Sequence, residues 1–180
     1  MELGSDGLVA GARQVASPNC DERPAGAVPT LLVVHSISLP PGVFEGDAVE
    51  QLFTNRLPPE SHPYFATLAG LRVSAHFFVR RDGELVQFVP TGLRAWHAGA
   101  SVWRGRERCN DFSIGVELEG ADDSAFSAAQ YDRVGGLVRA LMIRLPLRDI
   151  AAHSDIAPAR KTDPGPLFDW AHCLSLLSRG

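Results

Sequence analysis

Two side chains in one short, proline-rich segment could bind a metal ion. His153 and Asp163 lie within residues 151–170, and Lys161 lies between them. The prolines of this segment keep a helix or strand from running far, so the segment needs another source of order. A divalent ion bound by His153 and Asp163 would supply it, because metal–ligand bonds can fix a segment that has little apolar surface to bury. A further ligand must then come from elsewhere in the chain.

His35 is the candidate for that ligand. It closes the run TLLVVHS (residues 30–36), whose consecutive aliphatic residues predict a strand buried on both faces. Open α/β sheets place their chemistry at such strand ends, although a histidine there can also be merely hydrogen-bonded. Two histidines, one carboxylate and a water would form an open zinc site of the catalytic type. The spacing alone is a weak signal, since no HExxH helix fixes the geometry.

Glu117 is a candidate acid in a second predicted strand. In the segment FSIGVELEG (residues 112–120), apolar side chains alternate with Gly115, Glu117 and Glu119. A carboxylate on the face opposite the apolar one is solvent-exposed in most strands. It becomes a catalytic candidate only if a lysine or a metal-bound water lies beside it.

Residues 92–111 predict a long ordered loop, because they show neither a helical nor a strand period. The loop contains two tryptophans, one histidine and four arginines. Long ordered loops are usually functional. Tryptophan faces and arginine forks suit an amphipathic ligand such as a sugar bearing carboxylates. The alternative is a loop held together by its own aromatic packing.

The remaining elements must position these residues. Apolar spacing predicts helices over residues 46–56, with Asp47 in its first turn, and over residues 125–145, with Asp123 or Ser124 as cap. Gly135-Gly136 inside the second helix indicates close approach to another element. A short strand over residues 149–152 and a last helix from Phe168 to Leu177 complete the prediction.

Residues 73–90 predict an antiparallel hairpin around the turn Asp82-Gly83. His76 in its first strand is interpreted as a packed, hydrogen-bonded histidine. His62 lies among prolines and is interpreted as a solvated loop residue. Residues 1–28 contain prolines and small polar residues, and we expect mostly irregular chain lying over the domain.

Composition limits the class of protein. The 180 residues are 45% hydrophobic and 21% charged, which is ordinary for one globular domain. The formal net charge of -4 argues against nucleic-acid or membrane-surface partners. The start shows no secretory pattern and no long uncharged apolar run occurs, so we expect a cytoplasmic protein. Three distant cysteines without CxxC spacing are expected to be reduced.

Five blocks of sequence resemble the zinc-dependent N-acetylmuramoyl-L-alanine amidases, in the branch that acts on 1,6-anhydro-N-acetylmuramyl peptides. They are LLVVHSISLPPG, VSAHFFVRRDGELVQFVP, RAWHAGAS, GRERCNDFSIGVELEG and IAPARKTDPGPLFDW. The resemblance implies a single α/β (α+β) domain, residues 1–180, with a central mixed β-sheet flanked by helices, as in peptidoglycan-recognition proteins. It also implies a cytosolic enzyme that takes anhydromuropeptides, without an obligate protein partner.

The same resemblance assigns roles to individual residues. One Zn²⁺ per chain would be held by His35, His153 and Asp163, with Glu117 as the essential acid and Lys161 as the essential lysine. Four further positions would line the substrate groove: Ser36, Arg72, Trp96 and Arg108. Ser36 stands where the family more usually has asparagine, and Ala152, Ser154 and Asp155 also depart from the family pattern around His153. These departures bear on substrate affinity.

The implied reaction is hydrolysis of the amide between the lactyl group of the anhydromuramyl sugar and L-alanine. Glu117 would act as general base and Lys161 would stabilise the oxyanion, while Arg72 and Arg108 would hold stem-peptide carboxylates. The biological role implied is recycling of cell-wall fragments, which indirectly limits β-lactamase induction. Two alternatives remain: an amidase of intact murein and a muropeptide-binding module without activity.

Overall fold

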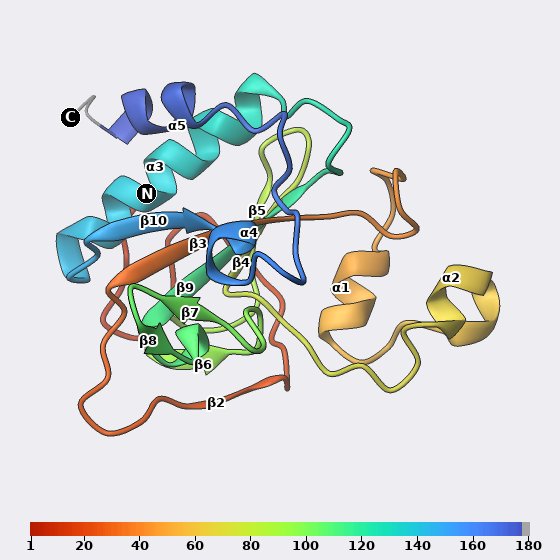
Figure 1. Cartoon of the computed structure of the whole chain (residues 1–180), viewed down its shortest axis with the longest axis horizontal. Helices are drawn as coiled ribbons and strands as arrows, with labels where there is room; N and C mark the ends of the chain where they lie inside the picture. The colour runs from red at the N-terminus through yellow and green to blue at the C-terminus, as the bar shows by residue number, and fades with distance from the viewer. Residues whose placement is uncertain (178–180) are drawn as a thin grey trace.

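The centre of the fold is a six-stranded mixed β-sheet (Figure 1). The computed structural model describes residues 1–177. The strand order is β1-β5-β4-β9-β3-β10. The strands span Arg13–Gln14 (β1), Leu85–Gln87 (β5), Phe77–Val79 (β4), Ser113–Glu119 (β9), Leu31–Ile37 (β3) and Asp149–Ala152 (β10). Strands β4, β9, β3 and β10 run parallel to one another. Strand β5 runs antiparallel to β4. The predicted mixed sheet and the predicted 149–152 strand are therefore confirmed.

Strands β3 and β9 lie inside the sheet, between other strands, and are covered on both faces. The first five residues of β3 and all seven residues of β9 are buried. The aliphatic run of β3 was predicted to be buried in this way. The Glu117 face of β9 is not solvent-exposed, as such a face is in most strands, because side chains from elsewhere in the chain, among them His97 at Gly115, cover it.

Two helices cover one face of the sheet, α3 (Ala128–Arg144) and α5 (Trp170–Leu177), and lie side by side above it in Figure 1. The core beneath them joins the apolar side chains of both layers, namely Leu32, Val34, Ile114, Val116, Leu118, Val134, Leu137, Val138, Leu141 and Leu176. Both predicted helices are present. The period-2 pattern of the strands and the helical stripe of α3 thus meet in one core.

The start of α3 differs from the prediction. Its N-cap is Ser127, not Asp123 or Ser124. The Ser127 hydroxyl accepts a hydrogen bond from the Gln130 N–H (3.1 Å), and the Gln130 side chain accepts one from the Ser127 N–H (3.0 Å). This reciprocal pair satisfies two backbone donors at once, which neither earlier residue achieves.

The two glycines inside α3 are positions of close approach, as predicted. A Cβ at Gly135 would lie 2.9 Å from the Leu176 Cβ on α5, and one at Gly136 would lie 2.6 Å from the Met1 Cε. The glycines therefore let α5 and the N-terminus pack directly against the helix.

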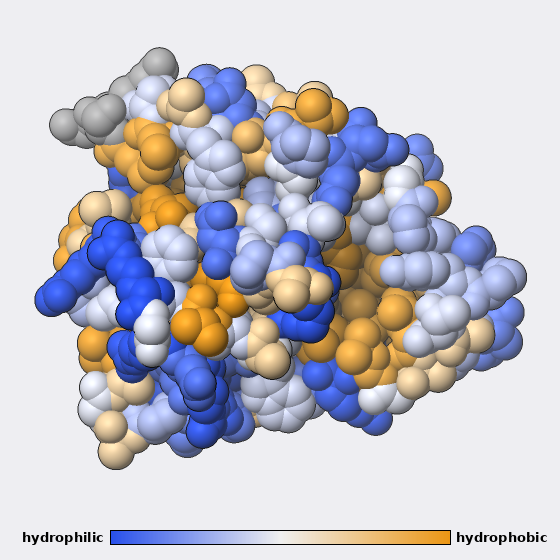
Figure 2. All heavy atoms as spheres, viewed as in Figure 1, coloured by the Kyte–Doolittle hydropathy of each residue, from blue (hydrophilic) through white to orange (hydrophobic). Residues whose placement is uncertain are grey.

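A separate lobe is formed by α1 (Ala48–Phe53), a 3-10 turn (Pro59–Ser61) and α2 (Pro63–Ala66). The predicted 46–56 helix is confirmed with narrower bounds, and Asp47 occupies its N-cap position without a side-chain hydrogen bond. Apolar side chains gather in a hollow over α1, between this lobe and the body of the molecule (Figure 2).

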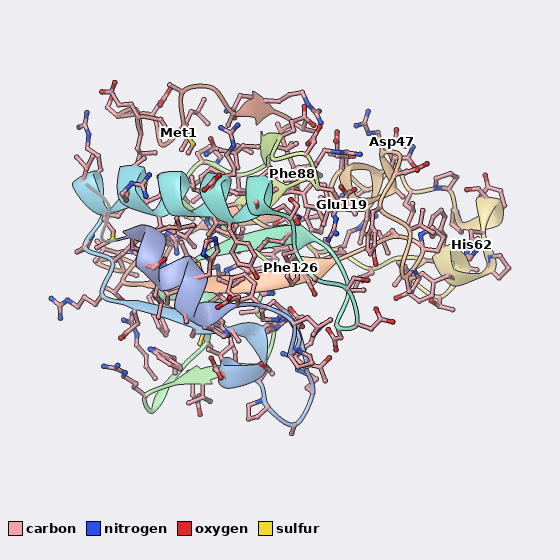
Figure 3. All side chains as sticks on the ribbon, turned by 90° about the horizontal axis from the view of Figure 1, so that it is seen from above. Met1, Asp47, His62, Phe88, Glu119 and Phe126 are labelled. Atoms are coloured by element: carbon pink, nitrogen blue, oxygen red, sulfur yellow. The ribbon has the colours of Figure 1, made fainter. Side chains whose placement is uncertain are left out.

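His62 lies at the outer end of this lobe, far from the middle of the sheet (Figure 3). Its Nδ1 accepts a hydrogen bond from the Tyr64 N–H (3.0 Å) and so caps α2, and the residue is exposed. The interpretation of His62 as a solvated loop residue is confirmed.

Residues 92–111 contain more regular structure than predicted. They form β6 (Leu93–Ala95), β7 (Val102–Trp103), β8 (Arg106–Glu107) and a 3-10 turn, Cys109–Phe112. In the N-terminal segment, β1 pairs with β5, and β2 (Cys20–Glu22) pairs with β6. Strands of two or three residues are too short to show a period in the sequence.

Arg23 ties the N-terminal segment to the middle of the domain. Its guanidinium donates to the carbonyls of Asn110 (3.0 Å), Asp111 (3.1 Å) and Ser113 (2.9 Å). Burial lowers the pKa of Arg23 to about 10. The N-terminal segment is thus fastened to the turn that precedes β9.

The predicted hairpin is present, with β4 and β5 joined by a turn in which Gly83 has φ +86°. His76 is fully buried just before β4. Its Nδ1 accepts a hydrogen bond from the Gly115 N–H (3.0 Å), and its Nε2 lies 3.1 Å from the Leu93 carbonyl oxygen. His76 is therefore a packed, hydrogen-bonded histidine, as predicted.

His76 should make stability depend on pH. Burial, with the nearby Arg23 charge, lowers its pKa to about 3 from 6.5. Between these values the unfolded chain binds a proton that the folded chain does not, so stability falls as the pH falls. His76→Asn keeps an acceptor for the Gly115 N–H but cannot titrate. We expect the unfolding free energy of His76→Asn to fall less steeply with falling pH than that of the wild type. The difference between the two slopes should be about 1.4 kcal/mol per pH unit between about pH 6 and pH 4. Urea unfolding across this range measures both slopes, and equal slopes would contradict the assignment.

No helix in the described part of the chain combines the length and apolar character needed to cross a membrane. Within residues 1–177 the three cysteines form no disulfide, and Cys109 and Cys173 are buried. Free cysteines were expected from their spacing.

Candidate active site

Three parallel strands bring their carboxyl ends together at one edge of the sheet. His35 near the end of β3 pairs in register with Glu117 of β9. On the other side of β3, Ala152 of β10 pairs with Val34, and His153 follows directly as the first residue of α4 (His153–Ile156). Residues 118 positions apart in the chain therefore meet through strand register alone.

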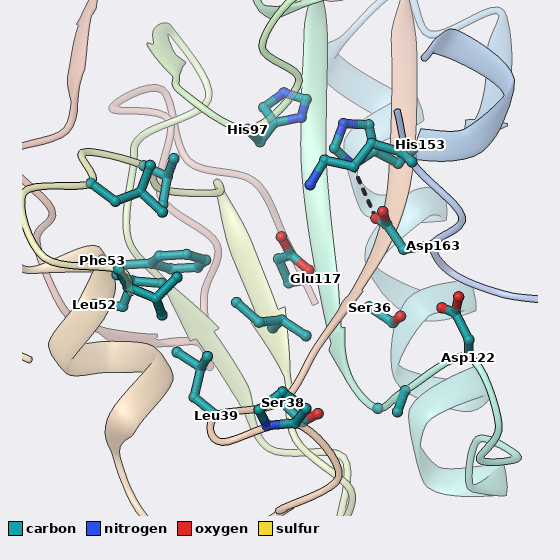
Figure 4. A pocket seen from close by; sticks show the side chains of 18 of the residues that line it. Ser36, Ser38, Leu39, Leu52, Phe53, His97, Glu117, Asp122, His153 and Asp163 are labelled. Atoms are coloured by element: carbon teal, nitrogen blue, oxygen red, sulfur yellow. Dashed lines mark hydrogen bonds and ion pairs between the residues drawn. The ribbon is translucent and has the colours of Figure 1, made fainter. Parts of the chain in front are cut away.

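His35, His153 and Asp163 form one compact group of donor atoms. The Nδ1 atoms of the two histidines lie 2.9 Å apart. The Asp163 Oδ2 lies 3.2 Å from the Nδ1 of His35 and 3.0 Å from the Nδ1 of His153. Figure 4 shows Asp163 facing His153 across this short distance. The structure thus brings together the three residues that the sequence analysis assigned to a metal.

The group has the dimensions of a tetrahedral metal site. Three donors held about 2.0–2.1 Å from a tetrahedral zinc ion lie roughly 3.3 Å from one another, close to the separations seen here. Two ring nitrogens and a carboxylate oxygen that converge without a cation would have to share protons. The chemistry of the donor set therefore fits a divalent ion.

The electrostatics of the group suit the same conclusion. Burial lowers the pKa of His35 to about 4, although Asp163 opposes this effect, so the ring is neutral near pH 7 and can offer a lone pair. Burial would raise the pKa of Asp163, but the neighbouring His153 and His35 rings outweigh this effect and hold the pKa below its usual range. Neutral imidazole and ionised carboxylate are the forms that bind metals.

Glu117 is the second component of the site. Its side chain points into the cleft in front of His153 and Asp163 (Figure 4), and the residue is only 9% exposed. Its Oε2 is buried and has no hydrogen-bond partner among the described residues. Burial, together with the charge of Asp163, raises the pKa of Glu117 well above its usual value, and Lys161 acts in the opposite direction. A buried carboxylate that lacks a partner is a functional candidate because its desolvation is otherwise uncompensated.

The cleft in front of these residues has a volume of about 520 Å³. Its lining has a polar side and an apolar side. The polar side includes Ser36, Glu117, Asp122, His153, Lys161 and Asp163, and the apolar side includes Leu39, Leu52, Phe53, Leu68, Leu71 and Val73. Such a cleft can hold a ligand with both polar and apolar surface.

Only some of the residues predicted to act on the substrate line the cleft. Ser36 and Lys161 line the cleft. Among the described residues, Arg72, Trp96 and Arg108 lie outside its lining. Arg72 borders a smaller neighbouring hollow, the Trp96 indole donates to Asp21 (3.2 Å), and the exposed Arg108 pairs with Asp111 (3.3 Å). Substrate contact by these three residues stays a prediction.

The sequence analysis missed His97. Its Nδ1 lies 2.9 Å from the Nε2 of His35, and its Nε2 lies 3.0 Å from the Ser113 hydroxyl. Burial lowers the pKa of His97 well below the usual value. The loop 92–111 gave no period that could place this ring, so no local signal could have identified it. Its partner Ser113 does share the Glu117 face of β9, which was visible in the alternation.

The residues around His153 that depart from the family pattern do not belong to the donor group. The Asp155 carboxylate accepts a hydrogen bond from the Ala152 N–H (2.8 Å), and the Ser154 N–H donates to the Asp163 carbonyl (3.0 Å). They shape the backbone that carries His153 and Asp163.

This fold, with a donor group that could hold a metal ion beside a cleft, is that of an amidase family. The family profile described as N-acetylmuramoyl-L-alanine amidase matches residues 25–166. The chain belongs to this family.

Its similarity to particular members extends over nearly the whole chain. The 1,6-anhydro-N-acetylmuramyl-L-alanine amidase AmpD of Escherichia coli is 56% identical over 179 residues, which covers 98% of each chain. The AmpD of Haemophilus influenzae is 47% identical over 172 residues, 94% of each chain. A crystal structure of an AmpD selenomethionine derivative superposes with a TM-score of 0.96 at 54% identity, covering 99% of this chain and 100% of that one.

A more distant solved structure contains a ligand. It is the complex of the E. coli N-acetylmuramyl-L-alanine amidase AmiD with anhydro-N-acetylmuramic acid-L-Ala-D-γ-Glu-L-Lys. Its TM-score is 0.60 at 29% identity, covering 88% of this chain and 65% of that one.

Proposed function

We propose that this protein hydrolyses the amide bond between the lactyl group of 1,6-anhydro-N-acetylmuramic acid and L-alanine in soluble muropeptides, with zinc as its cofactor. The observation that carries the proposal is the convergence of three possible metal donors, His35, His153 and Asp163, beside a buried carboxylate at one cleft, which His153, Asp163 and Glu117 line. Full-length similarity to amidases named for this substrate supports the choice of bond.

One zinc ion per chain would be held by the Nδ1 atoms of His35 and His153 and by the Oδ2 of Asp163. When bound there, it would polarise the scissile carbonyl and lower the pKa of a water in its open position toward roughly 7. An open position remains because the group supplies three protein ligands, not four.

Glu117 is the proposed general base. Its side chain lines the cleft and its Oε2 has no hydrogen-bond partner within the described chain, so the carboxylate is available to accept a proton from the attacking water. Its raised pKa makes it a better base than an ordinary glutamate and lets it return the proton to the leaving amine of L-alanine. Lys161, whose charge favours the ionised form of Glu117, lines the same cleft and would stabilise the oxyanion.

Replacing Lys161 tests the oxyanion assignment. We expect Lys161→Ala to lower kcat by about 10²- to 10³-fold, the loss typical of one oxyanion donor. Zinc content should not change, because Lys161 is not one of the three donors. The measurement is single-turnover kinetics together with metal analysis. The control is Arg104→Ala, which removes a cation outside the cleft that pairs with Asp149 (2.9 Å), and its turnover should stay near that of the wild type. Near-normal turnover of Lys161→Ala would make the assignment wrong.

The polar and apolar lining of the cleft suits the polar and apolar groups of an anhydromuropeptide. Its apolar wall offers contact surface for the sugar ring and the lactyl methyl group, and its polar side holds the donors for the amide. Ser36 is the proposed sugar contact within the cleft, and Arg72, Trp96 and Arg108 are proposed contacts further along the bound substrate. The AmiD complex shows a related fold with an anhydromuropeptide of this kind bound.

The proposed role is recycling of cell-wall fragments in the cytoplasm. Comparing soluble anhydromuropeptides with intact sacculi tests this choice. We expect efficient release of peptide from the soluble substrate and little from sacculi. Comparable cleavage of sacculi would identify an amidase of intact murein instead, and tight binding without cleavage would identify a binding module.

A further inference from the structure

His97 forms the first link of a hydrogen-bonded chain that starts at His35 and ends at a backbone carbonyl. The His35 Nε2 lies 2.9 Å from the His97 Nδ1. The His97 Nε2 lies 3.0 Å from the Ser113 hydroxyl oxygen, which lies 2.6 Å from the Cys109 carbonyl oxygen. All four residues are buried in this chain.

The last group in the chain fixes the position of every proton. A carbonyl oxygen can only accept, so the Ser113 hydroxyl must donate to the Cys109 oxygen. The Ser113 oxygen then accepts the proton on the His97 Nε2, and the neutral His97 ring has a bare Nδ1. That Nδ1 must accept from the His35 Nε2–H. The Nδ1 of His35, which faces His153 and Asp163, is therefore left with a lone pair.

Ala98, the residue after His97, fixes the tautomer of His153 in the same way. The Nε2 of His153 lies 3.3 Å from the Ala98 carbonyl oxygen, which can only accept. The proton of a neutral His153 ring therefore belongs on Nε2, and its Nδ1 is also left with a lone pair. Two consecutive residues, His97 and Ala98, thus direct both lone pairs to the place where Asp163 presents its carboxylate.

This two-residue segment is held rigidly. The Asn110 side-chain oxygen accepts hydrogen bonds from the N–H groups of His97 (3.1 Å) and Ala98 (2.8 Å). The His97 ring also packs flat on β9 at Gly115, where an added Cβ would lie 2.5 Å from the His97 Cγ. A glycine in the middle of a central strand is costly, and here it makes room for the ring.

We propose that His97, anchored by Ser113, is a positioning residue for metal binding: it accepts the Nε2 proton of His35 and so presents the bare Nδ1 of His35 to the ion. This inference rests on the proposed metal site. Partners of this kind keep a ligating histidine in one tautomer and one ring orientation, and their loss typically weakens metal affinity about 10- to 100-fold. His97 also lines the cleft, and in this proposal it acts on the metal through His35.

The first test is zinc affinity, measured without substrate by competition with a chromophoric chelator. We expect His97→Leu, which removes both ring nitrogens, to weaken zinc binding about 10- to 100-fold. His97→Asn keeps an acceptor oxygen near the position of Nδ1 and should recover most of that loss. Ser113→Ala leaves both histidines in place but removes the anchor, and we expect a smaller loss.

The matched control is His76→Asn. His76 is buried more deeply than His97, its ring centroid lies 5.9 Å from that of His97, and among the described residues it has no hydrogen bond to a proposed ligand. Its zinc affinity should equal that of the wild type, although its stability should not. Wild-type affinity in a folded His97→Leu protein, or an equal loss in His76→Asn, would overturn the proposal.

The second test needs no variant and no metal. Long-range ¹H–¹⁵N spectra of the zinc-free wild type near neutral pH report the tautomer of each histidine. We expect a proton on the Nε2 of His35 and on the Nε2 of His97, and a bare Nδ1 at His97. A His35 ring without a proton on Nε2 would overturn the proposal even if the variants failed to fold. Absence of zinc uptake by the wild type would contradict the proposed cofactor and leave this tautomer test intact.

Discussion

Glu117→Gln is expected to lower kcat about 10²- to 10⁴-fold, the range that a positioned general base contributes. Glutamine preserves the shape of the side chain but cannot accept the proton of the attacking water. Burial and Asp163 raise the pKa of Glu117. The acid limb of the wild-type pH–kcat/KM profile, where Glu117 becomes protonated, should therefore lie above the pH expected for an ordinary glutamate and should vanish in the variant.

Zinc content separates this effect from damage to the site. Glu117 is not one of the three donors, so Glu117→Gln should retain wild-type zinc. Glu119→Gln is the matched control. Glu119 follows on the same face of β9, but its carboxylate accepts from the Arg81 N–H (3.0 Å) and lies 3.8 Å from the Arg80 guanidinium. Turnover should fall far less in that variant, and near-normal turnover of Glu117→Gln would refute the assignment.

Asp163→Asn is expected to remove both zinc and activity. The amide is neutral and supplies a much weaker ligand than the carboxylate, and it no longer balances the charge of the ion. The loss of zinc affinity should exceed the roughly 100-fold upper limit for groups that only orient a ligand. The measurement is metal analysis after dialysis, followed by the same chelator competition.

Asp122→Asn is the matched control for this change. Asp122 lines the same cleft but does not belong to the donor group (Figure 4). It should keep one zinc per chain. Full zinc occupancy in Asp163→Asn would contradict the ligand set, and zinc loss in both variants would show that the charge of the cleft, not a specific ligand, holds the ion.

The sequence was sufficient for the parts of the fold that local patterns determine. The aliphatic run before His35 and the alternation around Glu117 each specify a strand, because burial and side-chain period are written into consecutive residues. The cap of α3 was misplaced because Asp123, Ser124 and Ser127 are all good caps locally. Only the reciprocal bonds with Gln130 select Ser127.

Long-range contacts account for what the sequence could not reveal. The burial of Glu117 depends on residues far away in the chain that cover β9, so the alternation of the strand alone left open whether this face is exposed. The role of His97 depends on contacts with His35, 62 residues away, and with Ser113, 16 residues away. The grouping of His35, His153 and Asp163 was suggested by their chemistry and by family resemblance, and strand register then explains why the two histidines meet.

The most direct test of the central claim is mass spectrometry of the products formed from 1,6-anhydro-N-acetylmuramyl tripeptide. The purified protein is examined as prepared, after chelation, and after zinc is restored. The account predicts that free tripeptide and 1,6-anhydro-N-acetylmuramic acid form. Their formation should stop after chelation and resume when zinc is restored. Intact substrate in the zinc-loaded sample, or cleavage that survives complete removal of the metal, would contradict it.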